Sequence, residues 1–68
     1  MHELSITQEI LRYSIQEAKR QDADRIRAIR LRLGPFSGIV PECIQIYLDL
    51  LSEGTIAHGA KIEAVIQP

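Results

Sequence analysis

Hydrophobic residues recur at two different spacings along this chain of 68 residues. From Ser5 to about Gln21 they return every three or four positions, which is the period of an amphipathic α-helix. Ser5 and Gln8 match a capping box, in which each side chain bonds the other's backbone amide, so the helix is expected to begin near Ser5. The predicted apolar face consists of Ile6, Ile10, Leu11, Ile15 and Ala18.

A period of two follows over residues 24–33, as in a β-strand with one buried side. Ile26 and Arg27 are out of phase with the later residues, which indicates a bulge or a strand that begins after Ile26. The turn-rich segment 34–38 ends the strand. The predicted inward residues are Ile29, Leu31 and Leu33.

Pro41 and Glu42 suit the first turn of a second helix. Its apolar residues cover more than half of the circumference, so we expect it to be buried more deeply than the first helix, with Gln45, Asp49 and Ser52 facing water. Gly54 is expected to close it in the left-handed conformation. The apolar residues are Cys43, Ile44, Ile46, Tyr47, Leu48, Leu50 and Leu51.

Residues 61–67 alternate again and predict a closing strand that turns Ile62, Ala64 and Ile66 inward. The order helix, strand, helix, strand predicts an α+β domain over residues 1–68, with two layers. Two helices would pack on one face of a two- to three-stranded mixed sheet, to which an extended N-terminus could add an edge strand. A single helix between the strands favours parallel pairing, although loops of this length also permit the reverse.

Charge and composition narrow the range of possible functions. Eight basic and nine acidic residues give a net charge of −1, and tryptophan is absent, so neither a nucleic acid nor a membrane surface is an expected partner. The chain shows no membrane-spanning run and no signal peptide, and its single cysteine fits a reducing compartment. We therefore expect a cytoplasmic protein. No nucleophile has a base at suitable spacing and no glycine-rich phosphate loop is present, so an enzyme is not expected.

Met1-His2-Glu3 is the candidate metal site. The terminal amine, the His2 amide and the His2 imidazole can close adjacent small chelate rings around one ion, and the Glu3 amide or a partner can fill a fourth position. Nitrogen ligands in a roughly planar array suit Ni(II) or Cu(II) better than Mg(II) or Ca(II).

Three other features are interpreted as structural. Arginines 25, 27, 30 and 32 are expected on a solvated outer strand face, where Glu63 can pair with them; a protein partner is the alternative. Cys43 is expected to be an inert core thiol. His58 is expected to be a solvated loop histidine, although it could complete a metal shell.

Several short segments, in this order and spacing, resemble the HypA family of nickel metallochaperones, also called the HybF group. The resemblance implies a carrier that binds Ni(II) through Met1, His2 and Glu3. It would deliver the ion to the large subunit of [NiFe]-hydrogenase, in concert with the GTPase HypB. The matching segments are 1–5, 33–34, 36–38, 40–42, 54–55 and 59–60.

Members of this family continue into a zinc domain built on two Cys-x-x-Cys pairs, which is missing here. The chain is thus expected to be the nickel-binding domain alone, with structural zinc only in the missing part. An alternative function is a metal-free interaction module that docks on HypB or forms a homodimer through its closing strand. A third is a small ligand-binding domain with a pocket at Phe36 and Tyr47.

Overall fold

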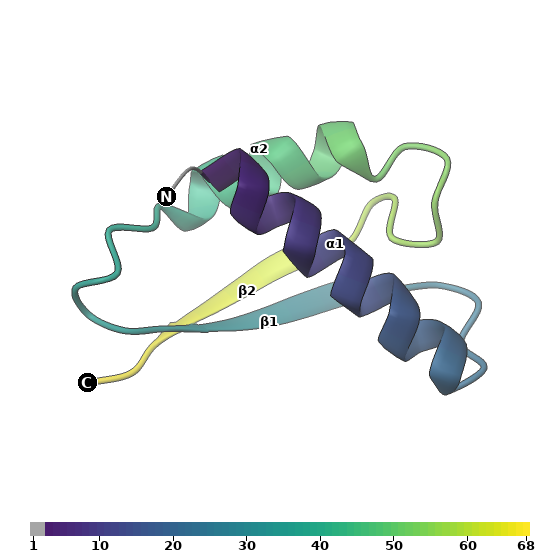
Figure 1. The fold of residues 1–68 in the computed structure, drawn as a ribbon, viewed down its shortest axis with the longest axis horizontal. Coiled ribbons are helices and arrows are strands. Elements are labelled where there is room, and N and C mark those ends of the chain that lie inside the picture. Colours follow the sequence, from purple (N-terminus) through teal and green to yellow (C-terminus); the bar gives the residue numbers. More distant parts are fainter. Residues whose placement is uncertain (1–2) are drawn as a thin grey trace.

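A computed structural model describes residues 3–68, and the predicted order of elements is confirmed (Figure 1). Helix α1 covers Glu3–Arg20 and strand β1 covers Ala28–Leu33. Helix α2 covers Pro41–Leu51 and strand β2 covers Lys61–Ile66. Neither helix of the described part combines the length and the apolar character that a membrane span requires.

The two strands pair in parallel, with Ala28 opposite Lys61 and Leu33 opposite Ile66. Residues 3–68 contain two strands only, so the sheet is not mixed. The prediction of an N-terminal edge strand is wrong from Glu3 onward, because the chain is helical from Glu3 to Arg20. Met1 and His2 lie outside the described residues. Of the two alternatives for Ile26 and Arg27, a bulge or a later start of the strand, the structure shows the later start, at Ala28.

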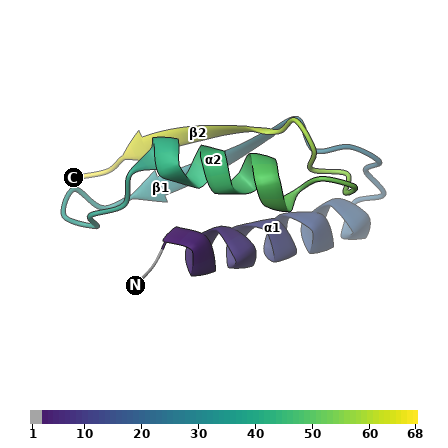
Figure 2. The same ribbon diagram turned by 90° about the horizontal axis from the view of Figure 1, so that it is seen from above.

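Both helices lie on the same side of the sheet, as the view in Figure 2 shows. Between these layers is a small aliphatic core, in which buried residues of β1, α2 and the segment before β2 form one cluster: Ile29, Leu48 and Ala60. The residues packed against them are Ile10, Leu11, Ile26, Leu31 and Ile62. The two-layer prediction is therefore confirmed.

Helix α1 begins two residues earlier than the capping box predicted. Because Glu3 already belongs to the helix, Ser5 and Gln8 lie on its exposed surface and do not cap it. The centre of the buried face is Thr7, which is fully buried. Its hydroxyl donates a 2.7 Å hydrogen bond to the Glu3 carbonyl, which satisfies the hydroxyl in an apolar setting.

Helix α2 is buried on one face, not around most of its circumference. Ile44 and Leu48 are fully buried, but Ile46 is 59% exposed and Leu50 is 69% exposed, so the prediction for these two was wrong. Ser52 was expected to face water and is fully buried. The reason is that α1 and β2 both contact α2 but leave the face that carries Ile46 and Leu50 uncovered, while in Figure 2 α2 lies between the sheet and α1.

Gln45 was also expected to face water, but it joins α2 to β2. Its amide nitrogen donates to the Ala60 carbonyl at 3.0 Å, and its amide oxygen accepts from the Ile62 amide at 2.7 Å. Successive amides of a strand point to opposite edges, and those of Lys61 and Gln67 point to β1. The Ile62 amide is thus on the open edge of β2, where Gln45 satisfies it.

Only the start of β2 is covered by the helices. Ile62 packs on the core, whereas Ala64 is exposed and Ile66 is 57% exposed, so their predicted burial was wrong. Gly54 has a φ of +80°, which confirms its predicted left-handed conformation, but the residue that caps α2 is Ser52, two positions earlier and in the right-handed region.

Candidate functional site

The one described residue of the predicted metal site is Glu3, the first residue of α1. Its side chain is partly buried. The first four amides of an α-helix have no partner within the helix, so the Glu3 amide nitrogen is not used by the helical hydrogen-bond pattern. The carboxylate is also favourably placed, because the amino end of a helix carries partial positive charge.

A hollow of about 340 Å³ lies directly beside Glu3. Its other lining residues are Ile6, from the first turn of α1, and Ser37, Gly38 and Ile39, from the loop between β1 and α2. The purple start of α1 and the teal loop before α2 lie at the same end of the molecule in Figure 1. The fold therefore brings segment 37–39 to the side chain that follows the predicted chelate.

Local hydrogen bonds fix the loop beside Glu3. The Ser37 amide donates to the Gly34 carbonyl at 3.2 Å, and the Ser37 hydroxyl accepts from the Ile39 amide at 3.3 Å. Gly38 has a φ of +72°, a conformation that side chains rarely adopt. A Ser-Gly pair thus suits this turn. Ser37 and Gly38 are among the residues that carry the family resemblance, but no local sequence pattern indicates that they lie beside Glu3.

Met1 and His2, the remaining predicted ligands, lie outside the described residues. Within residues 3–68 no three or more His, Cys, Asp or Glu side chains gather closely enough to hold a metal ion. His58 is exposed in the loop before β2, as predicted. Cys43, predicted to be a core thiol, is only partly buried in the first turn of α2.

The arginine-bearing face of β1 is exposed, as predicted. Arg30 and Glu63 stand opposite each other in the strand register, and their side chains approach to 3.4 Å. Both side chains are more than half exposed, so this pair contributes little to stability. The arginine-bearing face of β1 therefore has the properties of a solvated sheet face.

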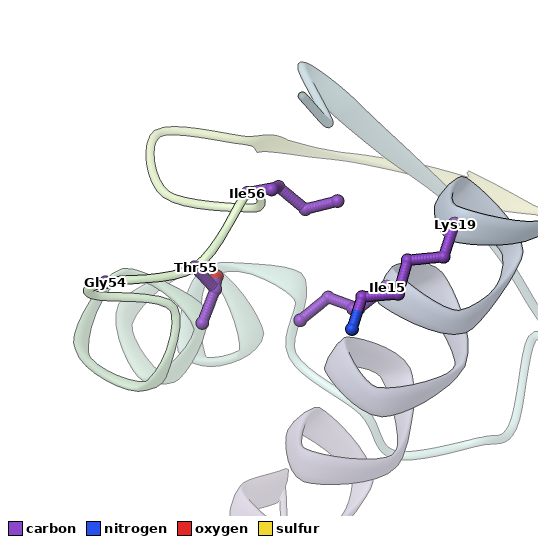
Figure 3. A pocket seen from close by; sticks show the side chains of 5 residues that line it. All are labelled: Ile15, Lys19, Gly54, Thr55 and Ile56. Carbon is purple, nitrogen blue, oxygen red and sulfur yellow. The ribbon is translucent and has the colours of Figure 1, made fainter. Parts of the chain in front are cut away.

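A second hollow, of about 290 Å³, lies between the later part of α1 and the loop after α2 (Figure 3). Ile15 and Lys19 line it from α1, and Gly54, Thr55 and Ile56 line it from the loop. The Lys19 ammonium is its only charged group, and an ammonium repels a metal cation. The pocket predicted at Phe36 and Tyr47 is not formed, because Phe36 is 98% exposed.

Comparison with known proteins agrees with the resemblance noted in the sequence. The model of a family described as "Hydrogenase/urease nickel incorporation, metallochaperone, hypA" matches residues 1–68. A hydrogenase maturation factor HypA from Methanopyrus kandleri is 40% identical over 67 residues, which cover 98% of this chain and 47% of that protein. A HypA from Dehalococcoides mccartyi is 40% identical over 63 residues, or 93% and 53% of the two chains.

A HypA from Methanothermobacter thermautotrophicus is 38% identical over 68 residues, which cover all of this chain and 56% of that protein. The chain thus spans about half the length of the curated relatives that it matches.

Proposed function

Because the chain belongs to the HypA family, which its sequence matches over residues 1–68, we propose that it carries Ni(II) for the maturation of [NiFe]-hydrogenase. The ion is held by the Met1 amine, the His2 amide and imidazole, and the Glu3 amide. The protein acts as a carrier in the cytoplasm and not as a catalyst. The observation that supports this most is the family match, which includes the Met-His-Glu segment itself.

The described start of α1 is compatible with this ligand set. The Glu3 amide has no helical partner, so using it as a ligand removes no hydrogen bond from the helix. The partial positive charge of a helix start disfavours a bare cation. Two amide nitrogens that have lost their protons offset the double charge of Ni(II) and reduce this penalty. A moderate affinity would suit a carrier that must release its cargo.

The remaining parts of the proposed function involve partner proteins and the region of the relatives that this chain does not cover. We propose that HypB, a GTPase, and the hydrogenase large subunit are the protein partners. We further propose that structural zinc is bound in the family's C-terminal zinc domain, since residues 3–68 contain only Cys43 as a thiol.

Calorimetric titration with Ni(II) tests the proposed site. His2→Ala removes one chelate ring, and one extra residue before Met1 displaces the terminal amine, so each should weaken nickel binding by at least tenfold relative to the wild type. His58→Ala, which alters the other histidine of the chain, serves as the matched control and should bind as the wild type does. Undiminished binding in both N-terminal variants would refute the site.

A metal-free interaction module is the second candidate. It is supported by the uncovered outer face of α2 and by the uncovered end of β2, whose Val65 and Ile66 are 41% and 57% exposed. An open, apolar strand end favours pairing with a second strand, including that of another copy. Binding to HypB, or dimerisation, without measurable nickel uptake would favour this function.

A further inference from the structure

The outer face of α2 combines apolar and acidic side chains in one patch. Glu42, Ile46 and Leu50 follow one another at intervals of four residues, and Asp49 and Glu53 are three residues beyond Ile46 and Leu50. Residues at these intervals are neighbours on a helix surface, which applies to the four residues within α2; Glu53 lies in the turn directly after its end. All five are exposed, Ile46 at 59% and Leu50 at 69%. We call Glu42, Ile46, Asp49, Leu50 and Glu53 the α2 outer patch.

The acids of the α2 outer patch form no ion pair within the described part of the chain. The ion pairs among residues 3–68 are Glu9–Arg12, Glu17–Arg20 and Arg30–Glu63, none of which includes Glu42, Asp49 or Glu53. Asp49 accepts a hydrogen bond from the uncharged Gln45 side chain at 2.9 Å. The patch therefore presents a net negative charge beside two exposed aliphatic side chains.

The position of these acids is also unfavourable for the helix itself. The carboxyl end of a helix carries partial negative charge, which favours Lys or Arg in the last turn. Helix α1 follows this rule with Lys19 and Arg20, whereas α2 has no basic residue in its last turn and places Asp49 and Glu53 near that end. A cation brought there from outside would interact favourably with both acids and with the helix end.

We propose that the α2 outer patch binds a positively charged amphipathic helix of a partner protein. Ile46 and Leu50 contact the apolar stripe of that helix, while Glu42, Asp49 and Glu53 pair with flanking Lys or Arg side chains. A second copy does not fit the same place, since a twofold contact through this patch sets acids against acids. The inference is independent of nickel, because none of the five residues belongs to the proposed metal site.

Nuclear magnetic resonance of the labelled chain tests the proposal with a synthetic amphipathic helix of leucine and lysine. At low salt this peptide should shift the amide signals of residues 42–53 and leave those of the exposed α1 face unchanged. A peptide in which glutamate replaces every lysine should cause no shift. Equal binding of both peptides, or shifts centred on another surface, would overturn the proposal.

Substitutions assign the binding energy to the patch. Ile46→Ser and Leu50→Ser should each weaken the lysine peptide about tenfold, because each removes an apolar anchor. The triple variant Glu42→Gln, Asp49→Asn, Glu53→Gln should weaken it by a similar factor at low salt and abolish the salt dependence. All are surface changes, and circular dichroism checks that the fold is retained.

Matched controls exist on α1. Tyr13 is 61% exposed, close to the value of Ile46, and Glu9 is an exposed acid. Tyr13→Ser and Glu9→Gln should leave peptide binding unchanged. Peptide binding that survives the α2 substitutions, or that falls equally in the α1 controls, would contradict the proposal. So would dimerisation of the free chain through residues 42–53, because the occupant would then be a second copy.

Discussion

The two helices of this domain differ in how far their charged and apolar side chains find partners within the domain itself. Helix α1 is electrostatically self-sufficient: it has an acid in its first turn, bases in its last turn, and the internal pairs Glu9–Arg12 and Glu17–Arg20. Helix α2 supplies fully buried Ile44 and Leu48 to the core, yet exposes Ile46 and Leu50 and carries acids without bases. The difference indicates that the exposed charges of α1 are balanced within the helix, whereas α2 has an exposed apolar and acidic face that is suited to binding a partner.

The largest expected effect concerns the core. Leu48→Ala in α2 should lower the free energy of unfolding by about 2–5 kcal/mol, because a fully buried leucine leaves a cavity. Leu11→Ala in α1 should cost roughly half as much, since Leu11 is only partly buried. Urea unfolding followed by circular dichroism measures both. Equal losses would contradict the deeper burial of α2. Ile44→Val is a milder check and should lower the free energy of unfolding by about 1 kcal/mol.

The next largest change in stability is expected for Gln45, which bridges α2 and β2, in contrast to a glutamine on the surface. Gln45→Ala should cost about 1–3 kcal/mol, because the Ala60 carbonyl and the Ile62 amide lose their partner in a partly buried place. Gln16→Ala on the exposed side of α1 is the matched control and should change stability by less than about 0.5 kcal/mol. Similar values for the two variants would show that the bridge is not formed in solution.

Each helix is associated with one fully buried hydroxyl, and the two should respond in opposite ways. Thr7→Val removes the 2.7 Å hydrogen bond to the Glu3 carbonyl and should destabilise the fold by about 1 kcal/mol. The Ser52 hydroxyl at the end of α2 has no hydrogen-bond partner among the described residues. Ser52→Ala should therefore be neutral or stabilising by up to about 1 kcal/mol. A clear loss of stability in Ser52→Ala would reveal an unseen partner.

The smallest effect is the pH dependence of α1. Hydrogen bonds from Arg20, helped by its charge, lower the pKa of Glu17 in the folded state. A lowered folded pKa means that this contribution is present above the unfolded pKa and is lost as the pH falls through the folded pKa. The stabilities of the wild type and Glu17→Gln should therefore converge at acid pH. A gap that persists there would contradict the pairing, and Arg20→Gln should remove the same dependence.

The fold was largely predictable because its strongest signals are local. The alternation that placed Ile29 and Leu33 inward depends only on the two-residue period of a strand, and both are buried. The α2 surface was not predictable in the same way, since an apolar residue such as Leu50 does not reveal whether another element covers it. Gln45 was missed because its partners Ala60 and Ile62 are 15 and 17 residues away.

Of the three residues predicted to form the metal site, the structure describes the position of Glu3 alone. Glu3 was named from the sequence, and the structure adds that it begins α1 and borders a hollow with Ser37 and Gly38. That neighbourhood arises from packing between segments more than 30 residues apart, which no local pattern encodes. The ligand roles of Met1, His2 and Glu3 stay a prediction.

Nuclear magnetic resonance of the chain loaded with one equivalent of Ni(II) tests the central claim most directly. Planar nitrogen coordination makes the ion diamagnetic, so the spectrum remains sharp while amides that become ligands lose their protons. The account predicts that the amide signals of His2 and Glu3 disappear, the His2 ring signals shift, and His58 and Cys43 are unaffected. Nickel that instead perturbs His58 or Cys43 and leaves the His2 and Glu3 amides intact would contradict it.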